Sequence, residues 1–393
     1  MENTLIQNFA ITYSYPIVFT EKLFQLTNTE LKDFLYEHRN LYFKQKVLLV
    51  VDDAVWKTHP YLSHDIQTYF DAIDCVQLAK APLIIAGGER CKNDTQVLDS
   101  IIKVIDDYGI DRHSYVIGLG GGAVLDLVGF AAAVSHRGIR HIRIPTTVLS
   151  QNDSGVGVKN SVNYKGKKNF LGTFAPPVAV FNDFSLLSSL DSRSWVAGIS
   201  EAIKVALIKD LPFFNWICDH AVSLRQHDSI HMKELIFRCA DLHLEHIRNG
   251  DPFEYGSSRP LDFGHWSAHK LEQLTDFSLL HGEAVAIGLA IDVLYSHFIG
   301  NIKEEEAFLV INLMQELGLP IYHEILSSAD NLDKLLAGLI EFQEHLGGRL
   351  TVVLLEEMGR GKDYHEIDPA LVRRAIDFLK KYQQIPNLIH ENS

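Results

Sequence analysis

Short apolar segments alternate with amphipathic segments over the first half of the chain. A buried strand is predicted at 46–51, where valine and leucine run together, and further strands are predicted at 83–86 and 139–144. Alternating apolar and polar residues predict a short β element within 8–19, and residues 96–108 have helical spacing. Strands that alternate with helices between about 45 and 183 predict a largely parallel α/β sheet, with ligands at the carboxyl ends of its strands.

The pattern changes near residue 185, because apolar residues then recur at helical spacing. Helices are predicted at 193–208, 230–248, 265–274, 281–298, 303–317, 331–345 and 369–382. One exception is the apolar run 350–355, which predicts a short strand or extended segment. The chain is therefore predicted to form an α/β domain, residues 1–185, and a helical domain, residues 186–393.

A glycine-rich run, 118–122, lies between a predicted strand and a predicted helix. Glycines let the backbone approach an anion, and a helix N-terminus offers free N–H groups, so this arrangement is typical of a phosphate cradle. The spacing departs from the common dinucleotide fingerprint, and a tight turn that only packs is the other interpretation. Asp52 and Asp53, which follow strand 46–51, are placed either to meet a ribose hydroxyl or to cap the next helix.

Composition and charge limit the class of protein. The chain has 393 residues, 47% of them apolar and 22% charged, as expected of a globular protein. A net charge of −14 disfavours a nucleic-acid partner. Four cysteines without paired spacing indicate a reducing compartment, and the first residues lack the features of a signal peptide. We expect a cytoplasmic protein without a membrane span.

Two charged residues stand in an apolar helix. Glu201 and Lys204 are three residues apart in the segment 195–208 and therefore share one helix face. Buried charges must be paired or bound to a metal, because lone buried charges are very costly. This pattern has two interpretations, a structural ion pair and a functional site.

Histidines recur in the helical half. His265 and His269 share one helix face, and His281 follows seven residues beyond that helix. A carboxylate and two imidazoles from three segments would form an open site for zinc or a similar ion, with one position left for substrate. The chain has 19 histidines, so chance pairs are expected, and some are interpreted as structural or surface residues: His113, His141, His220 and His227.

Cationic residues cluster just beyond the Pro145–Thr147 turn. Lys159, Lys168 and Asn169 lie where lysines and amides suit a phosphate ester. A solvated loop is the preferred interpretation for Lys165 and Lys167.

Together these motifs resemble the 3-dehydroquinate synthase family of sugar phosphate cyclases. They occur in family order over roughly residues 45–360, as GGE with Lys92, GGGAVLD, HRG, PTTVLSQND, a lysine loop ending KKN, SEAIK, FGH and LHGEAVAIG. The resemblance implies a Rossmann-like NAD-binding domain, an all-α metal-binding domain, an active site in the cleft between them, and a homodimer. It also implies transient oxidation of a sugar phosphate by NAD, β-elimination of phosphate, return of the hydride and an intramolecular aldol closure.

The resemblance also implies roles for individual residues. NAD would contact Asp52, Glu89, Lys92, Gly121, Gly122, Asp126, Thr146, Thr147, Asp153 and Lys168. Zinc, or cobalt, would be held by Glu201, His265 and His281. Phosphate would be held by Lys159, Asn169 and His269, with Arg137 supplied by the partner subunit, and Lys204 would contact substrate hydroxyls.

The sequence departs from dehydroquinate synthases where those enzymes bind the substrate carboxylate. His243 falls near the family's lysine, and Ser258 or Arg259 falls at its arginine. Asp262 replaces an asparagine before the first metal histidine. The late phosphate lysine is not evident, and Glu344 or His345 stands nearby. Losing a cation and gaining an anion should disfavour a carboxylated substrate.

These departures predict a cyclase that acts on a neutral sugar such as sedoheptulose 7-phosphate. Arg259 keeps a true 3-dehydroquinate synthase, acting on 3-deoxy-arabino-heptulosonate 7-phosphate, as an alternative. Metal-dependent glycerol and alcohol dehydrogenases form a second alternative, but they need no phosphate cluster. A non-catalytic paralogue is a third, although a scaffold has no evident need for the metal set and the glycine loop.

Overall fold

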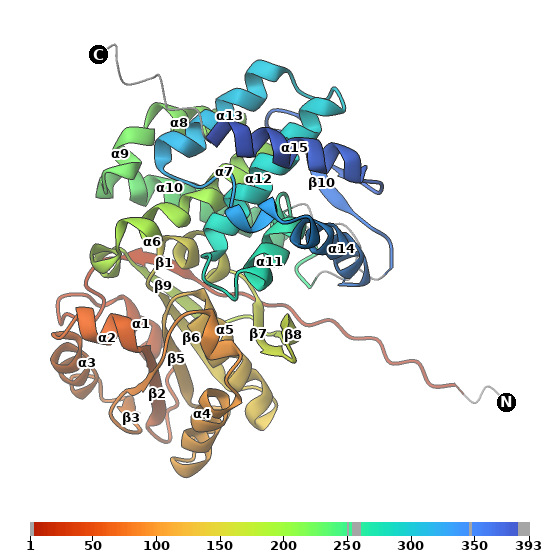
Figure 1. The fold of residues 1–393 in the computed structure, drawn as a ribbon. Helices are drawn as coiled ribbons and strands as arrows, with labels where there is room; N and C mark the ends of the chain where they lie inside the picture. The colour runs from red at the N-terminus through yellow and green to blue at the C-terminus, as the bar shows by residue number, and fades with distance from the viewer. Residues whose placement is uncertain (1–3, 250, 254–260, 346–347, 384–393) are drawn as a thin grey trace.

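The computed structural model describes residues 4–249, 251–253, 261–345 and 348–383. Its central feature is a seven-stranded sheet in which every pairing is parallel, in the order β1-β9-β6-β5-β2-β3, with β4 also paired to β2 (Figure 1). The strands are β1 (Ile17–Thr20), β2 (Gln45–Asp52), β3 (Val76–Leu78), β4 (Leu83–Ile85), β5 (Tyr115–Gly120), β6 (Arg140–Pro145) and β9 (Ala179–Asp183). The predicted parallel α/β sheet is thus confirmed.

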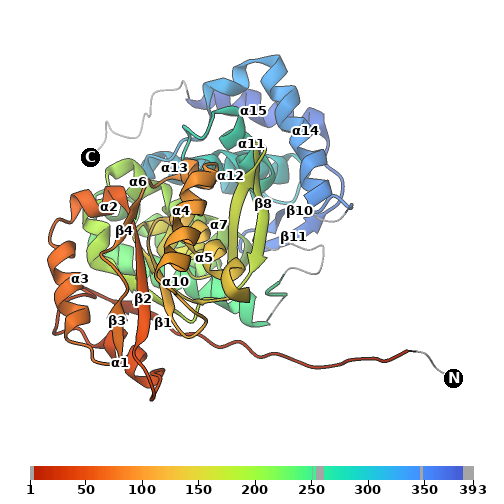
Figure 2. The ribbon, with the colours of Figure 1, turned by 90° about the horizontal axis from the view of Figure 1, so that it is seen from below.

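Helices cover both faces of this sheet (Figure 2). Alternate residues of β2 belong to two different cores, with Val47 and Leu49 in one and Leu48 and Val50 in the other. The first core includes residues of α1 (Glu30–Glu37) and α3 (Leu62–Asp71), and the second those of α4 (Thr95–Asp107) and α5 (Gly122–Val134). Because both faces are buried, β2 contains a continuous apolar run from Val47 to Val51.

Helices dominate the chain after residue 185, and one large core unites them. They are α6 (Ser192–Ala197), α7 (Ile199–Lys209), α8 (Leu211–Asp219), α9 (Ala221–Arg225), α10 (Ser229–Asn249), α11 (His265–Leu274), α12 (His281–Phe298), α13 (Glu304–Leu317), α14 (Ala329–His345) and α15 (Pro369–Gln383). The nearly all-apolar α12 lies at the centre and packs against α7, α11, α13 and α15. The division at residue 185 stays a prediction, although the last sheet strand ends at Asp183 and α6 begins at Ser192.

Two antiparallel hairpins complete the fold. One is β10 (Val352–Glu357) with β11 (Arg360–Tyr364), which extends the predicted strand 350–355 into a pair. The other is β7 (Lys159–Tyr164) with β8 (Lys167–Phe174). The lysine-rich segment expected to be a loop is therefore mostly a hairpin, with Lys165 in its turn and Lys167 exposed.

Some expected boundaries were wrong. The β element expected within 8–19 is a strand only from Ile17, because pairing with β9 begins there, and the chain before it extends away from the body (Figure 1). The helix expected at 193–208 is divided into α6 and α7 at Gly198. A Cβ atom at Gly198 would lie 2.5 Å from the backbone nitrogen of Leu149, so that point requires glycine.

In the described part of the chain, no helix combines the length and apolarity that crossing a membrane requires. The four cysteines are all free thiols. Two of the histidines interpreted as structural or surface residues are His141 and His227. His141 is a buried residue of β6, and the ring of His227 stacks on Trp195.

Candidate active site

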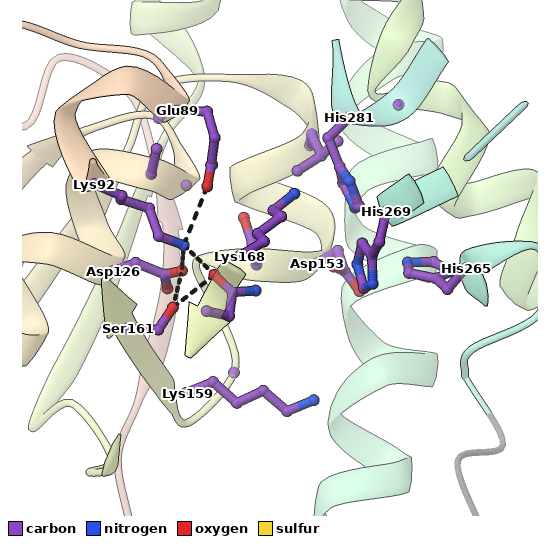
Figure 3. Close-up of a pocket in the computed structure, with 18 of the residues that line it drawn as sticks. Glu89, Lys92, Asp126, Asp153, Lys159, Ser161, Lys168, His265, His269 and His281 are labelled. Atoms are coloured by element: carbon purple, nitrogen blue, oxygen red, sulfur yellow. Dashed lines mark hydrogen bonds and ion pairs between the residues drawn. The ribbon is translucent and has the colours of Figure 1, made fainter. Parts of the chain in front are cut away.

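A cavity of about 840 Å³ lies between the carboxyl ends of the sheet strands and helices α7, α10, α11 and α12 (Figure 3). On the sheet side it is lined by residues predicted for NAD: Asp52, Glu89, Lys92, Gly121, Gly122, Asp126, Thr147, Asp153 and Lys168. Residues predicted for substrate and metal also line it: Lys159, Asn169, Lys204, Asp262, His265, His269 and His281. Groups singled out on separate grounds therefore open onto one space.

Three of the predicted residues that the structure describes do not line this cavity. Glu201 is fully buried just behind its wall, and Thr146 is buried below the glycine turn with its backbone N–H donating to Gly120. Arg137 lies in the turn between α5 and β6, outside the cavity. Arg259 falls outside the described residues, as does Ser258, and the side chains of Glu344 and His345 are not described either.

Three side chains form a group suited to a metal ion. Glu201 comes from the first turn of α7, while His265 and His281 are the first residues of α11 and α12. Their ligand atoms all lie within 4.8 Å of one another, and each histidine Nε2 is 3.6 Å from Oε1 of Glu201. One carboxylate and two imidazoles match the ligands of a catalytic zinc site, which keeps a further position open.

The surroundings of Glu201 also fit a cation. Burial alone would raise its pKa, but Lys204 and the two histidines outweigh burial and hold the pKa well below its usual range. Lys204 forms an ion pair with this carboxylate, yet within the described structure neither oxygen has a hydrogen bond of good geometry. A buried, ionised and poorly satisfied carboxylate beside two imidazoles is what a divalent ion requires.

Lys204 connects this group to the sheet side of the cavity. Its Nζ is 4.0 Å from Oδ1 of Asp153, and the same oxygen is 2.8 Å from Nδ1 of His243 on α10. Burial would lower the pKa of Lys204, but Glu201, Asp153 and Asp262 outweigh it and raise the pKa. Lys204 is therefore a fixed positive charge at the cavity wall.

Glu272 on α11 orients His281, one of the three candidate metal ligands. Its Oε2 lies 3.0 Å from Nδ1 of His281, and its Oε1 lies 2.6 Å from Nζ of Lys168 on β8. Glu272 also belongs to a second possible ligand group with His269 and His281. Because the Lys168 ammonium already pairs with Glu272, we interpret this carboxylate as the hydrogen-bond acceptor that fixes the ring of His281.

Replacing Glu272 with glutamine should weaken metal binding by about 10–100-fold, because second-sphere acceptors of ligating histidines contribute that much. The measurement is metal affinity by competition with a chelator. The matched control is Glu341→Gln on α14. It removes an ion pair with Lys270, which lies on α11 like Glu272, and it should leave the metal affinity unchanged. Equal affinities in wild type and Glu272→Gln would contradict this role.

A second polar cluster forms around the buried Lys92. Its Nζ lies 2.7 Å from Oδ2 of Asp126 and 2.5 Å from Oδ1 of Asn169 (Figure 3). Ser161 donates to both Asp126 and Asn169, and Glu89 lies 3.7 Å from the ammonium. Burial would lower the pKa of Lys92, but Asp126 and Glu89 outweigh it and raise the pKa. The cluster joins α5 to the β7–β8 hairpin beside the cavity.

The glycine turn is closely packed. A Cβ atom at Gly122 would lie 2.5 Å from Ser154 Oγ, and one at Gly120 would lie 2.9 Å from Val124. In the described structure no side chain caps α5, whose N-cap is Gly121, so its first N–H groups face the cavity wall without a side-chain acceptor. Asp52 both caps α2 (Asp53–Thr58), by accepting from Ala54, and lines the cavity.

Two contributors to this site were not found from the sequence. Ser161 binds Asp126 and Glu272 binds Lys168, and these partners are far away in the chain, so no local spacing indicates them.

Comparisons with known proteins show which family the chain belongs to. The family model for the 3-dehydroquinate synthase N-terminal region matches residues 82–197, and the C-terminal model matches 198–339. The 3-dehydroquinate synthase of Acinetobacter baumannii (strain SDF) is 34% identical over 334 residues, covering 84% of this chain and 89% of that protein.

Two solved structures bear on the fold. The 2-epi-5-epi-valiolone synthase of Streptomyces hygroscopicus subsp. jinggangensis 5008, solved with NAD+ and Zn2+, matches with a TM-score of 0.86 and 27% identity, covering 96% of this chain and 100% of that one. A probable glycerol dehydrogenase from Sinorhizobium meliloti 1021 shares the fold at a TM-score of 0.62 and 16% identity, covering 93% and 97%. The matched models span most of the chain, and it belongs to the 3-dehydroquinate synthase family.

Proposed function

We propose that this protein is an NAD- and metal-dependent sugar phosphate cyclase that converts a neutral heptulose 7-phosphate to a carbocycle with loss of phosphate. One observation carries the proposal. The Glu201–His265–His281 group, the glycine turn and Lys159 all meet at one cavity. Zinc or cobalt would be held by those three ligands, and NAD would lie along the glycine turn, Asp52 and the Lys92 cluster.

When bound there, the metal would polarise a substrate oxygen, and NAD would accept and return one hydride. The chain's own residues then position the substrate. Lys204 is a fixed cation beside the candidate metal ligand Glu201, and it can donate a hydrogen bond to a substrate hydroxyl. Burial and the nearby Lys168 hold the pKa of His269 well below its usual range. The ring of His269 is therefore neutral, and its N–H can donate a hydrogen bond to phosphate.

Lys159 would hold the leaving phosphate through charge-assisted hydrogen bonds. Asn169, predicted for the same task, lies in the Lys92 cluster, so in this proposal it connects the phosphate to the cofactor side. Arg137 would complete the phosphate site from a second copy of the chain. Its position outside the cavity of its own chain is compatible with that role, and a homodimer is part of the proposal.

The preference for a neutral sugar follows from local charge. His243 and Asp262 line the cavity where dehydroquinate synthases are expected to have a lysine and an asparagine. His243 is already engaged with Asp153, and Asp262 adds a negative charge near Lys204. A carboxylate would lose a cationic partner and meet an anion, whereas a polyol end can donate to Asp262.

A second candidate is a true 3-dehydroquinate synthase, favoured by the name of the 34% identical relative and by Arg259. The probable glycerol dehydrogenase shares only the fold, at 16% identity. The cationic side chains proposed here to bind phosphate argue against a dehydrogenase, which needs no phosphate site.

The test compares kcat/KM for sedoheptulose 7-phosphate and 3-deoxy-arabino-heptulosonate 7-phosphate, each with NAD+ and Zn2+. We expect the neutral sugar to be preferred by about tenfold or more, because one charge-assisted hydrogen bond is worth about 1.5–3 kcal/mol. His243→Lys with Asp262→Asn should move the ratio toward the carboxylated sugar, whereas the exposed control Asp241→Asn on α10 should not. Efficient 3-dehydroquinate formation without turnover of neutral heptuloses would contradict the proposed specificity.

A further inference from the structure

Arg143, near the carboxyl end of β6, is a fully buried arginine outside the residues discussed for catalysis. Nη1 donates to the carbonyl oxygens of Ser154, Gly155 and Gly157 at 3.3, 3.2 and 2.9 Å. Nη2 donates at 2.7 Å to both the carbonyl oxygen of Lys159 and Oδ1 of Asn160. In the described part of the chain no carboxylate forms an ion pair with it, so backbone carbonyls supply most of its compensation.

These acceptors belong to residues 154–160, here called the wall segment. Its two remaining carbonyls before Asn160 are also satisfied, since Tyr15 donates to Val156 and the N–H of Ala175 donates to Val158. Buried carbonyls need partners, and a desolvated guanidinium needs acceptors, so each stabilises the other. Arg143 thereby fixes a segment that is neither helix nor sheet over most of its length.

The wall segment forms part of the proposed active site. Ser154, Gly157, Val158, Lys159 and Asn160 line the cavity. Asp153, which faces Lys204 and His243, comes directly before it, and a Cβ atom at Gly157 would lie 3.4 Å from His243 Nε2. A shift of this backbone would move Lys159 relative to the histidines of the helical part.

We propose that Arg143 is a positioning residue that holds the wall segment in the shape that directs Lys159 at the substrate phosphate. This inference rests on the proposed role of Lys159 in phosphate binding. The planar guanidinium reaches five acceptors from two nitrogens, which a single ammonium cannot do, so lysine is not a conservative replacement.

The test measures the affinity of the NAD- and zinc-loaded protein for inorganic phosphate, together with KM and kcat. Arg143→Lys should weaken phosphate binding by about tenfold or more and raise KM more than it lowers kcat. Zinc stoichiometry and NAD+ affinity should stay within about twofold of wild type. Arg140→Lys is the matched control, because Arg140 lies at the other end of β6 and contacts Tyr115.

A double-mutant cycle separates positioning from general stability. In a Lys159→Ala background, Arg143→Lys should weaken phosphate binding little further, because its effect passes through Lys159. Full additivity, or unchanged phosphate affinity in a folded Arg143→Lys protein, would overturn the inference. If Lys159→Ala alone leaves phosphate affinity unchanged, the proposed phosphate site itself fails.

A milder variant covers the case in which Arg143→Lys does not fold. Tyr15→Phe removes only the hydroxyl that donates to Val156, within the same wall segment. It should weaken phosphate binding several-fold with zinc stoichiometry unchanged. Wild-type phosphate affinity in Tyr15→Phe, with Arg143→Lys unfolded, would assign Arg143 a purely structural role and overturn the inference.

Discussion

Replacing His265 with alanine should remove most of the bound zinc and abolish turnover while the fold persists. Zinc held by four ligands gains about 10–16 kcal/mol, so one ligand contributes about 3 kcal/mol, or about 10²-fold in affinity. His265 is the first residue of α11, and the helix N-terminus does not depend on its side chain for a cap. Metal content after dialysis, measured beside circular dichroism, gives the result.

The control for this experiment is His64→Ala, because His64 is an exposed histidine on α3 that does not line the cavity. It should retain wild-type zinc content. Zinc stoichiometry that is unchanged in a folded His265→Ala protein would show that the metal is held elsewhere.

Replacing Lys204 with methionine should destabilise the metal-free protein strongly. Glu201 is fully buried and forms an ion pair with this ammonium, so methionine leaves a buried carboxylate without its cation. Removing one partner of a buried ion pair costs about 3–5 kcal/mol. Zinc should restore much of this stability, because a divalent cation at Glu201 replaces the lost positive charge and binds only the folded state.

The measurement is thermal unfolding of Lys204→Met with a chelator and with zinc. Lys209→Met on the same helix is the matched control, because Lys209 is only half-buried and should change stability little in either condition. A Lys204→Met protein as stable as wild type in chelator, or equally unstable with zinc, would contradict this account of the Glu201 site.

The sequence indicated the architecture where burial imposes a simple pattern. The middle of β2, residues 47–51, is wholly apolar because both faces of the sheet are covered. The middle of α12 is apolar on all sides apart from Asp292, because helices surround it. The β7–β8 hairpin was missed because β7 is buried while its lysine-rich partner β8 is mostly exposed, which hides the alternation of a strand pair.

The residues of the candidate site also fall into those that the sequence indicated and those that it did not. Glu201, His265 and His281 could be singled out because local spacing and family motifs mark them, and the structure brings their ligand atoms together. Glu272 and Arg143 could not, because their partners are set by folding. Lys168 is 104 residues from Glu272, and Arg143 binds carbonyl groups, which every residue carries. No side-chain pattern encodes an acceptor of that kind.

The most direct test of the central claim follows phosphate and NADH together during turnover. The purified protein is incubated with Zn2+, substoichiometric NAD+ and sedoheptulose 7-phosphate. A redox-neutral cyclase predicts many phosphates released per NAD+, one carbocyclic product per phosphate, and no net NADH. Accumulation of one NADH per oxidised sugar, without phosphate release, would contradict the account and indicate a dehydrogenase.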